Sequence, residues 1–260
     1  MGSTIPGSYF RYVNGDFVTT KGLELRYTLR RTQRLSTQIN YTLTLGEGTA
    51  SNSAAATSSL YMNTPLPTTI NPLEFSQKHT GSISVDYRFG DNDGGLLLQN
   101  FGANVLFKFS SGHPYTKVNY IGGQTDPYNA GVDYMYDTRD RISKESIGAS
   151  TTPWTFYADL KLDKSFKLGG LSATVYAIVN NVFNRKNVIN VFQLTGSAED
   201  DGYISDPDRY ETNANANGGQ DYVDMYNAIN IKNGQAYWDW LNQELYGHPR
   251  QIFVGIKVSF

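Results

Sequence analysis

The chain has 260 residues, a formal net charge of −2 and no cysteine. That length fits one large all-β domain or two smaller ones. The charge, with no basic run in the sequence, argues against a nucleic-acid-binding surface, and the cysteine count excludes disulfides and thiolate metal sites. Aromatic residues make up 13% of the sequence and 25 residues are Gly, which favours strands and turns over helices.

Alternation of apolar and polar side chains predicts about seven strands, because neighbouring residues of a strand point to opposite faces of a sheet. The predicted strands cover residues 22–31, 35–45, 79–90, 96–111, 154–166, 171–183 and 251–260. The last strand carries an apolar stripe made of Ile252, Val254, Ile256, Val258 and Phe260. The apolar sets assigned to the other strands, such as Phe156, Ala158, Leu160 and Leu162, contain no charge.

Long polar segments separate the predicted hairpins, at residues 46–78, 112–153 and 184–247. Short turns and long loops therefore alternate, and an up-and-down barrel would place all the long loops on one side. Loops above roughly 12 to 15 residues are uncommon in compact domains unless they are functional. The spacing of Tyr237, Leu241 and Leu245 predicts one short helix, at residues 234–247.

These patterns favour an all-β fold, specifically an antiparallel up-and-down transmembrane β-barrel segment of about seven strands with long extracellular loops. In such a segment the polar faces line a wet lumen. Four aromatic residues, Tyr41, Tyr87, Trp154 and Phe260, lie near predicted strand ends, where an aromatic girdle is expected. Alternation alone also fits a soluble β-sandwich, in which the apolar faces pack on one another.

Five stretches, in this order along the chain, resemble the barrel of the TonB-dependent outer-membrane receptors, and are most similar to the bacteroidete-type importers. They are NGDFVTTKGLE at 14–24, NYT at 40–42, PWTFYADLKLDK at 153–164, NNVFNRKN at 180–187 and HPRQIFVGIKVSF at 248–260. Each motif alone is weak, but five in sequence over most of the chain are fairly specific.

The resemblance implies that residues 1–260 are the C-terminal portion of the barrel of a nutrient importer in the Gram-negative outer membrane, for glycan, peptide or chelate uptake. The family has a barrel of about 22 strands, an N-terminal plug and a TonB-binding segment, which we expect to lie outside this chain. The fragment is not expected to transport alone. Implied partners are outer-membrane lipid, the barrel assembly machinery that reads Phe260, TonB through the N-terminal part, and a surface lipoprotein.

The long loops carry the residues that we expect to contact a ligand. Tyrosine and tryptophan offer flat amphipathic faces that suit sugars or peptides, although the same rings could pack loop against loop. The candidates are Tyr115, Tyr120, Tyr134, Tyr136, Tyr237, Trp238 and Trp240.

The sequence gives no reason to expect an enzyme, a cofactor or a metal site. His79, His113 and His248 are far apart in sequence and have no partner at metal-ligand or catalytic-triad spacing, so structural or solvated histidines are favoured. The acidic segment 199–208 could hold a cation, although a solvated loop is the commoner outcome for such a cluster.

Two other functions fit the same patterns. A soluble secreted β-sheet module would use the aromatic loops to bind glycans. A small stand-alone outer-membrane barrel of eight strands would need residues 5–14 to supply the additional strand.

Overall fold

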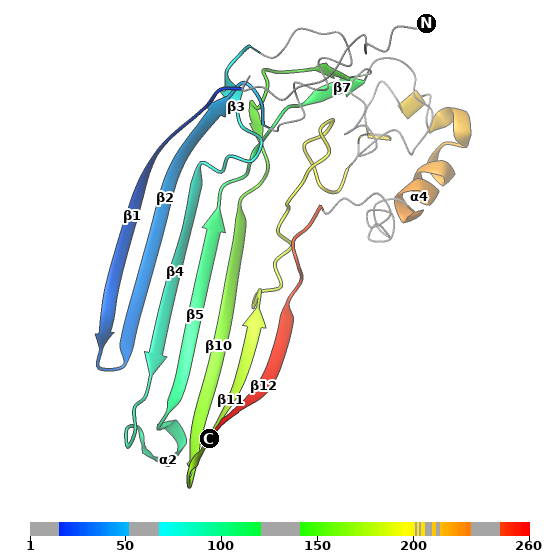
Figure 1. The fold of residues 1–260 in the computed structure, drawn as a ribbon. Helices are drawn as coiled ribbons and strands as arrows, with labels where there is room; N and C mark the ends of the chain where they lie inside the picture. Colours follow the sequence, from blue (N-terminus) through cyan, green and yellow to red (C-terminus); the bar gives the residue numbers. More distant parts are fainter. Residues whose placement is uncertain are drawn as a thin grey trace, which may run out of the picture.

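The computed structural model describes residues 16–51, 68–120, 141–200, 202, 204–205, 210–211, 214–229 and 245–260. Its main feature is an antiparallel sheet whose long strands follow one another in chain order (Figure 1). These strands are β1 (Val18–Thr32), β2 (Leu35–Gly48), β4 (His79–Arg88), β5 (Phe101–Ser110), β10 (Thr155–Leu168), β11 (Leu171–Asn180) and β12 (Gln251–Ser259). The short β3 (Asn71–Pro72) pairs with β2. The predicted all-β class and the seven predicted strands are confirmed.

The strand register places the apolar stripes of all these strands on one face, because directly opposite residues of an antiparallel pair share a face. One row across the sheet consists of Tyr27, Ile39, Ile83, Phe107 and Ala158. A second row consists of Val85, Val105, Leu160, Val179 and Ile252. The other face carries the polar residues, so the sheet has two chemically distinct sides.

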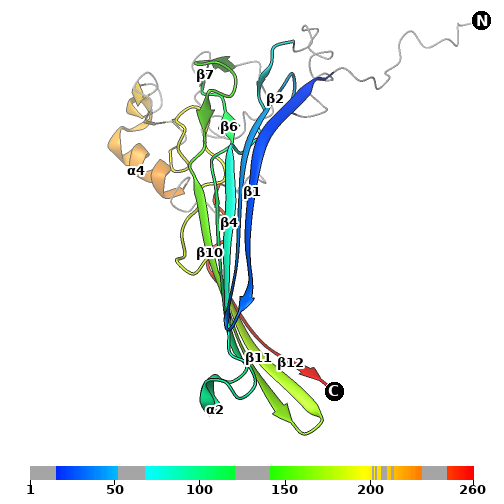
Figure 2. The same ribbon diagram turned by 90° about the vertical axis from the view of Figure 1, so that its left-hand side faces the viewer.

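The apolar face is exposed on the edge strands β1 and β12 and partly exposed on the strands between them, where the sheet is one layer thick (Figure 2). On β12, for example, Val254 is 74% exposed. Most of the fully buried apolar side chains of the described residues lie instead among the loops, where Phe192, Ala198 and Leu245 form a cluster. The described residues therefore form no packed core on the apolar face.

Tight connections join the strands at one end of the sheet (Figure 1). The connection between β4 and β5 differs from the sequence prediction. Residues 96–98 were expected to begin a strand, but they form the short helix α2 (Gly95–Leu98), and β5 begins at Phe101. Gly94 and Gly95 both have positive φ, at 80° and 71°, a conformation that glycine adopts without steric cost. The turn between β4 and β5 therefore includes Leu96, Leu97 and Leu98.

The opposite end carries the long loops and their short elements (Figure 1). These elements are the pair β6 (Pro114–Tyr115) and β9 (Ser150–Thr151), the pair β7 (Val118–Tyr120) and β8 (Arg141–Ser143), the turn η3 (Asn215–Asn217) and the helix α4 (Gln220–Ile229). The sequence prediction left α4 in a loop, and the helix that it placed at 234–247 falls mostly outside the described residues. No helix among the described residues is long and apolar enough to cross a membrane.

Candidate functional site

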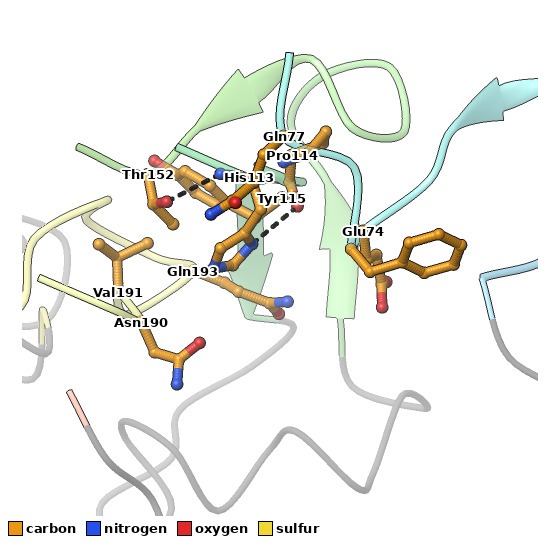
Figure 3. Close-up of a pocket in the computed structure, with 10 residues that line it drawn as sticks. Glu74, Gln77, His113, Pro114, Tyr115, Thr152, Asn190, Val191 and Gln193 are labelled. Atoms are coloured by element: carbon orange, nitrogen blue, oxygen red, sulfur yellow. Dashed lines mark hydrogen bonds between the residues drawn. The ribbon is translucent and has the colours of Figure 1, made fainter. Parts of the chain in front are cut away.

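A hollow of about 470 Å³ opens among the loops at the long-loop end of the sheet (Figure 3). Its wall comes from the segment before β4, the β6 strand, the residue after β9 and the segment that follows β11. The polar lining consists of Glu74, Gln77, His113, Tyr115, Thr152, Asn190 and Gln193, and the apolar lining of Phe75, Pro114 and Val191. Amide, hydroxyl and aromatic groups around one carboxylate can bind a ligand rich in hydrogen-bonding groups.

Hydrogen bonds between segments hold the wall of the hollow in place. The ring atom Nε2 of His113 lies 2.8 Å from the carbonyl oxygen of Ile189, and the backbone N–H of His113 donates to the hydroxyl of Thr152 at 3.1 Å. The imidazole therefore takes part in a contact between two loop segments.

Glu145 links the loop segments that carry the short strands β6 to β9. Its carboxylate accepts a hydrogen bond from the backbone N–H of Lys117 at 2.7 Å and another from the hydroxyl of Ser150 at 3.0 Å. Both bonds favour the ionised form, and they lower the pKa of Glu145 below its ordinary value, the bond from Lys117 contributing most. The arrangement of these loops consequently depends on an ionised carboxylate.

Two buried asparagines anchor the loops to the sheet, and the sequence analysis did not single them out. The side chain of Asn187, 1% exposed, accepts from the N–H of Phe156 at 2.9 Å and donates to its carbonyl oxygen at 2.8 Å. The side chain thereby makes the two backbone hydrogen bonds that a neighbouring strand would otherwise make at the start of β10. Asn181 has a similar role beside β11. The signal was present, since both lie in the Asn-rich stretch 180–187.

A row of stacked rings crosses the apolar face near the long-loop end. The ring of Trp154 stacks on His79 at 5.6 Å, on Phe156 at 6.2 Å and on Phe109 at 6.4 Å between centroids. The hydroxyl of Tyr41 lies 2.8 Å from Nδ1 of His79. The residues Tyr41, His79, Phe109, Trp154 and Phe156 are called the upper aromatic row below.

A second group of aromatic residues lies on the same face at the turn end. Tyr87 and Phe89 meet edge to face at 5.5 Å, and the guanidinium carbon of Arg34 lies 4.4 Å from the ring centroid of Phe89. Arg34 also pairs with Asp93, and this hydrogen-bonded pairing holds the pKa of Asp93 below its ordinary value. From His79 to Tyr87 the path along β4 is about 26 Å at roughly 3.3 Å per residue.

One charged residue breaks the apolar face at the turn end. Lys164 shares the face of Leu160 and Leu162, so the outward side of β10 is not free of charge along its whole length. Its ammonium group donates to the carbonyl oxygen of Gln99 and lies 5.6 Å from the ring centroid of Phe166. A long side chain at such an edge keeps its charge on backbone oxygens while its stem lies along apolar surface.

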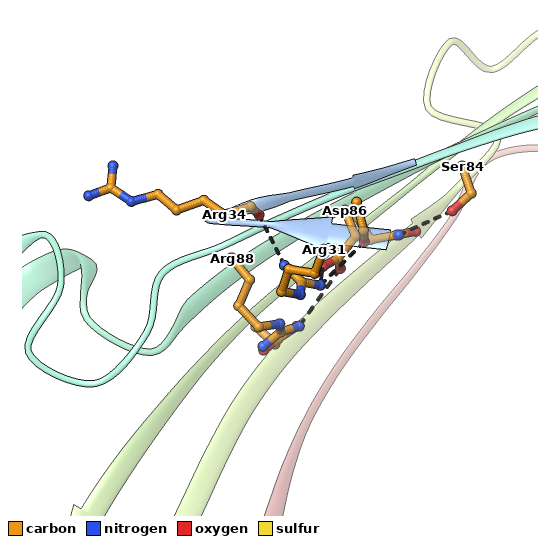
Figure 4. A network of polar contacts seen from close by, with 8 residues as sticks. Arg31, Arg34, Ser84, Asp86 and Arg88 are labelled. Carbon is orange, nitrogen blue, oxygen red and sulfur yellow. Dashed lines mark hydrogen bonds and ion pairs between the residues drawn. The ribbon is translucent and has the colours of Figure 1, made fainter. Parts of the chain in front are cut away.

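The polar face carries ion pairs that cross several strands (Figure 4). Arg88 on β4 donates two hydrogen bonds to Asp163 on β10, at 2.7 and 2.8 Å, and lies near Asp86 at 3.9 Å. Asp86 in turn pairs with Arg31 at the end of β1. Because Asp163 is only 8% exposed, its pairing with Arg88 compensates for a largely desolvated charge.

Only some of the predicted ligand-contact residues lie within the described part of the chain. Tyr115 lines the hollow, with its hydroxyl against Gly196, where an added Cβ would lie 2.4 Å away. Tyr120 lies on β7, but its side chain is outside the described part. The remaining candidates, Tyr134, Tyr136, Tyr237, Trp238 and Trp240, lie outside the described residues. Phe260, the predicted assembly signal, is fully exposed at the turn end of the sheet.

No group of three or more potential metal ligands occurs among the residues that the structure describes. In the acidic segment, the carboxylate of Asp200 accepts from the N–H of Gly202 and the hydroxyl of Ser205, at 2.9 and 2.7 Å. Glu199 accepts from the hydroxyl of Tyr246 at 3.2 Å, and burial together with this carboxylate raises the pKa of Tyr246 to about 12. Asp201, Asp206 and Asp208 fall outside the described residues.

No known protein family, curated protein or solved structure matches this chain. Function is therefore inferred from its own residues and their geometry.

Proposed function

We propose that the chain is part of the β-barrel of a TonB-dependent nutrient importer in the Gram-negative outer membrane. The observation that carries this proposal is the exposed apolar face, whose aliphatic band lies between the upper aromatic row and the aromatic group at the turn end. Outer-membrane barrels carry an outward apolar band about 25 Å tall between two aromatic girdles. At the roughly 35–45° tilt of barrel strands, the roughly 26 Å path along β4 spans about 19 to 22 Å of that height.

Water is a poor environment for this face. Burying apolar surface contributes about 25 cal/mol per Å², and monomeric soluble proteins rarely expose contiguous apolar patches beyond a few hundred Å². A soluble glycan-binding module would need a second layer over the face, and the described residues supply none. Hydrocarbon chains of lipid supply the missing apolar contacts, which supports the membrane location.

The pairing at the edges of the sheet favours a segment of a larger barrel over a small closed barrel. Within the described residues β1 pairs only with β2, and β12 pairs only with β11. In hydrocarbon each unpaired backbone group costs several kcal/mol, so both edges need neighbouring strands. We infer that the rest of the importer's barrel supplies them, with the ion pairs of the polar face lining the lumen.

In this proposal the hollow and its loops form part of the outer surface that captures the nutrient, a glycan, peptide or chelate. The chain does no enzymatic chemistry and does not transport by itself. Coupling to TonB occurs through another part of the importer, a surface lipoprotein assists capture, and the barrel assembly machinery reads Phe260. These partners are supported by the family resemblance of the five sequence stretches.

A pair of matched substitutions tests the proposal. Val254→Lys places a charge on the apolar face midway along β12, and a charge that faces lipid costs up to about 2 to 4 kcal/mol in a bilayer. Gln38→Lys places the same charge on the polar face of β2. We expect Val254→Lys to reduce recovery of the chain in the outer-membrane fraction and in phospholipid vesicles, while Gln38→Lys has little effect. Equal recovery of both variants, or a stable monomer in detergent-free buffer, contradicts the proposal.

A further inference from the structure

Two arginines stand at the rim of the apolar face, at the long-loop end of β11 and β12. The guanidinium carbon of Arg185 lies 5.0 Å from the ring centroid of Phe156, which belongs to the upper aromatic row. Arg250 directly precedes β12, two residues before Ile252 in the apolar stripe of that strand. Both cations therefore lie where the aromatic row ends and the loops begin.

A buried amide holds the two arginine-bearing segments together. The Nδ2 group of Asn181, a residue 3% exposed, donates to the carbonyl oxygens of Arg185 and His248, at 3.0 and 3.1 Å. The side-chain oxygen of Asn184 accepts from the backbone N–H of Arg250 at 2.9 Å. The backbone on both sides is thereby fixed, which lowers the entropy lost when both side chains bind one ligand.

Neither arginine is neutralised within the described part of the chain. Arg31, Arg34 and Arg88 each pair with a carboxylate, whereas no described carboxylate pairs with Arg185 or Arg250. Among the described residues, the side chain of Arg250 hydrogen-bonds the carbonyl oxygen of Val182, at 3.5 Å. Beside them Phe183 is 79% exposed, so this corner combines two available guanidinium groups with an exposed apolar ring.

We propose that the corner formed by Phe183, Arg185 and Arg250 binds the phosphate group of an anionic membrane lipid. Guanidinium groups bind phosphate oxygens through paired, charge-assisted hydrogen bonds, and the aromatic ring lies beside the acyl chains at the interface. The inference rests on the proposed membrane location, because only lipid around the apolar face brings a headgroup to this rim.

The test uses the full chain in a neutral detergent, with phosphatidic acid and the diacylglycerol of identical acyl chains as probes. These two lipids differ by the phosphate alone. Native mass spectrometry gives the affinity for each. We expect phosphatidic acid to bind at least tenfold more tightly, and removal of either guanidinium (Arg185→Ala or Arg250→Ala) to weaken its binding about fivefold.

Two further variants control for general charge and for folding. Lys257→Ala removes a cation on the polar face of β12 and leaves the affinity unchanged, while Arg185→Lys keeps most of it. Equal binding of both lipids, or an unchanged affinity in the variant lacking both guanidiniums, overturns the inference. Displacement of phosphatidic acid by an equal concentration of inorganic phosphate also overturns it, because the acyl chains then contribute nothing. A chain that does not associate with detergent at all contradicts the membrane location instead.

Discussion

Arg88 reaches Asp163 across the backbone of an intervening strand, and Gly102 on that strand makes the contact possible. Arg88, Gly102 and Asp163 are directly opposite one another on β4, β5 and β10. A Cβ at position 102 would lie 2.5 Å from the guanidinium carbon of Arg88. The glycine thus lets a long side chain lie flat on the sheet and pair across two strand spacings.

Loss of this pair is expected to destabilise the chain. Asp163→Asn removes the charge that compensates Arg88 and should lower the free energy of unfolding in phospholipid vesicles by about 1 to 3 kcal/mol. Urea titration followed by tryptophan fluorescence measures this change. Asp91→Asn is the matched control, because its partner Lys167 is well exposed and exposed pairs contribute little. Equal effects of both substitutions would contradict a special role for the buried pair.

Gly81 has an equivalent role on the apolar face. A Cβ there would lie 2.3 Å from the ring of Phe109, so Gly81→Ala should displace that ring from Trp154 and cost about 1 to 3 kcal/mol by overpacking. Near-ultraviolet circular dichroism should change with it, since the stacked rings give that signal. At Gly90 nothing lies within 4 Å of the added atom, and Gly90→Ala should leave both measurements close to wild type.

Asn187 is expected to be among the most sensitive loop residues. Asn187→Ala leaves the N–H and the carbonyl oxygen of Phe156 without their partners in a buried position, at a cost of about 2 to 4 kcal/mol. Thermal or urea unfolding measures the loss. Asn215, on the exposed side of η3, gives a control whose replacement by alanine should change stability by less than about 0.5 kcal/mol. A neutral Asn187→Ala variant is the contradicting result.

Acid should loosen the loops that Glu145 joins. Because the folded state holds the pKa of Glu145 below its ordinary value, the carboxylate stabilises the loops above the ordinary pKa, and this contribution is lost as pH falls through the lowered value. Protection of the Lys117 amide from hydrogen exchange, measured against the intrinsic exchange rate at each pH, should therefore decrease in acid. Glu145→Gln retains an acceptor that does not titrate and should remove the pH dependence. Protection that decreases equally with falling pH in the variant rules out this cause.

The strands could be predicted because their signal is local. Ile252, Val254 and Ile256 alternate with polar or small residues, and that period alone places them on one face. The prediction failed at Leu96 to Leu98, where consecutive leucines continue an apolar pattern but two preceding glycines with positive φ extend the turn. Helix α4 was missed for a different reason, because its short apolar pattern lies within a long polar segment.

The contacts that define the site are not local. Arg88 and Asp163 are 75 residues apart, and their pairing depends on the register of three strands. Likewise, His113 and Ile189 meet only because the loops after β5 and β11 rise from the same end of the sheet. Sequence periodicity gives the face of each residue but not its partner on another strand, so Tyr115 could be named as a loop candidate while the other lining residues could not.

In the proposed membrane location the two faces of β12 meet different media, and the absence of native cysteine allows a direct measurement. Single spin labels are attached at Ile252→Cys, Val254→Cys and Ile256→Cys on one face, and at Gln251→Cys and Lys257→Cys on the other, in the full chain reconstituted in phospholipid vesicles. We expect collision with oxygen to dominate at the first three positions, and collision with a water-soluble nickel complex to dominate at the other two. Uniform accessibility to the nickel complex along β12 would contradict the claim.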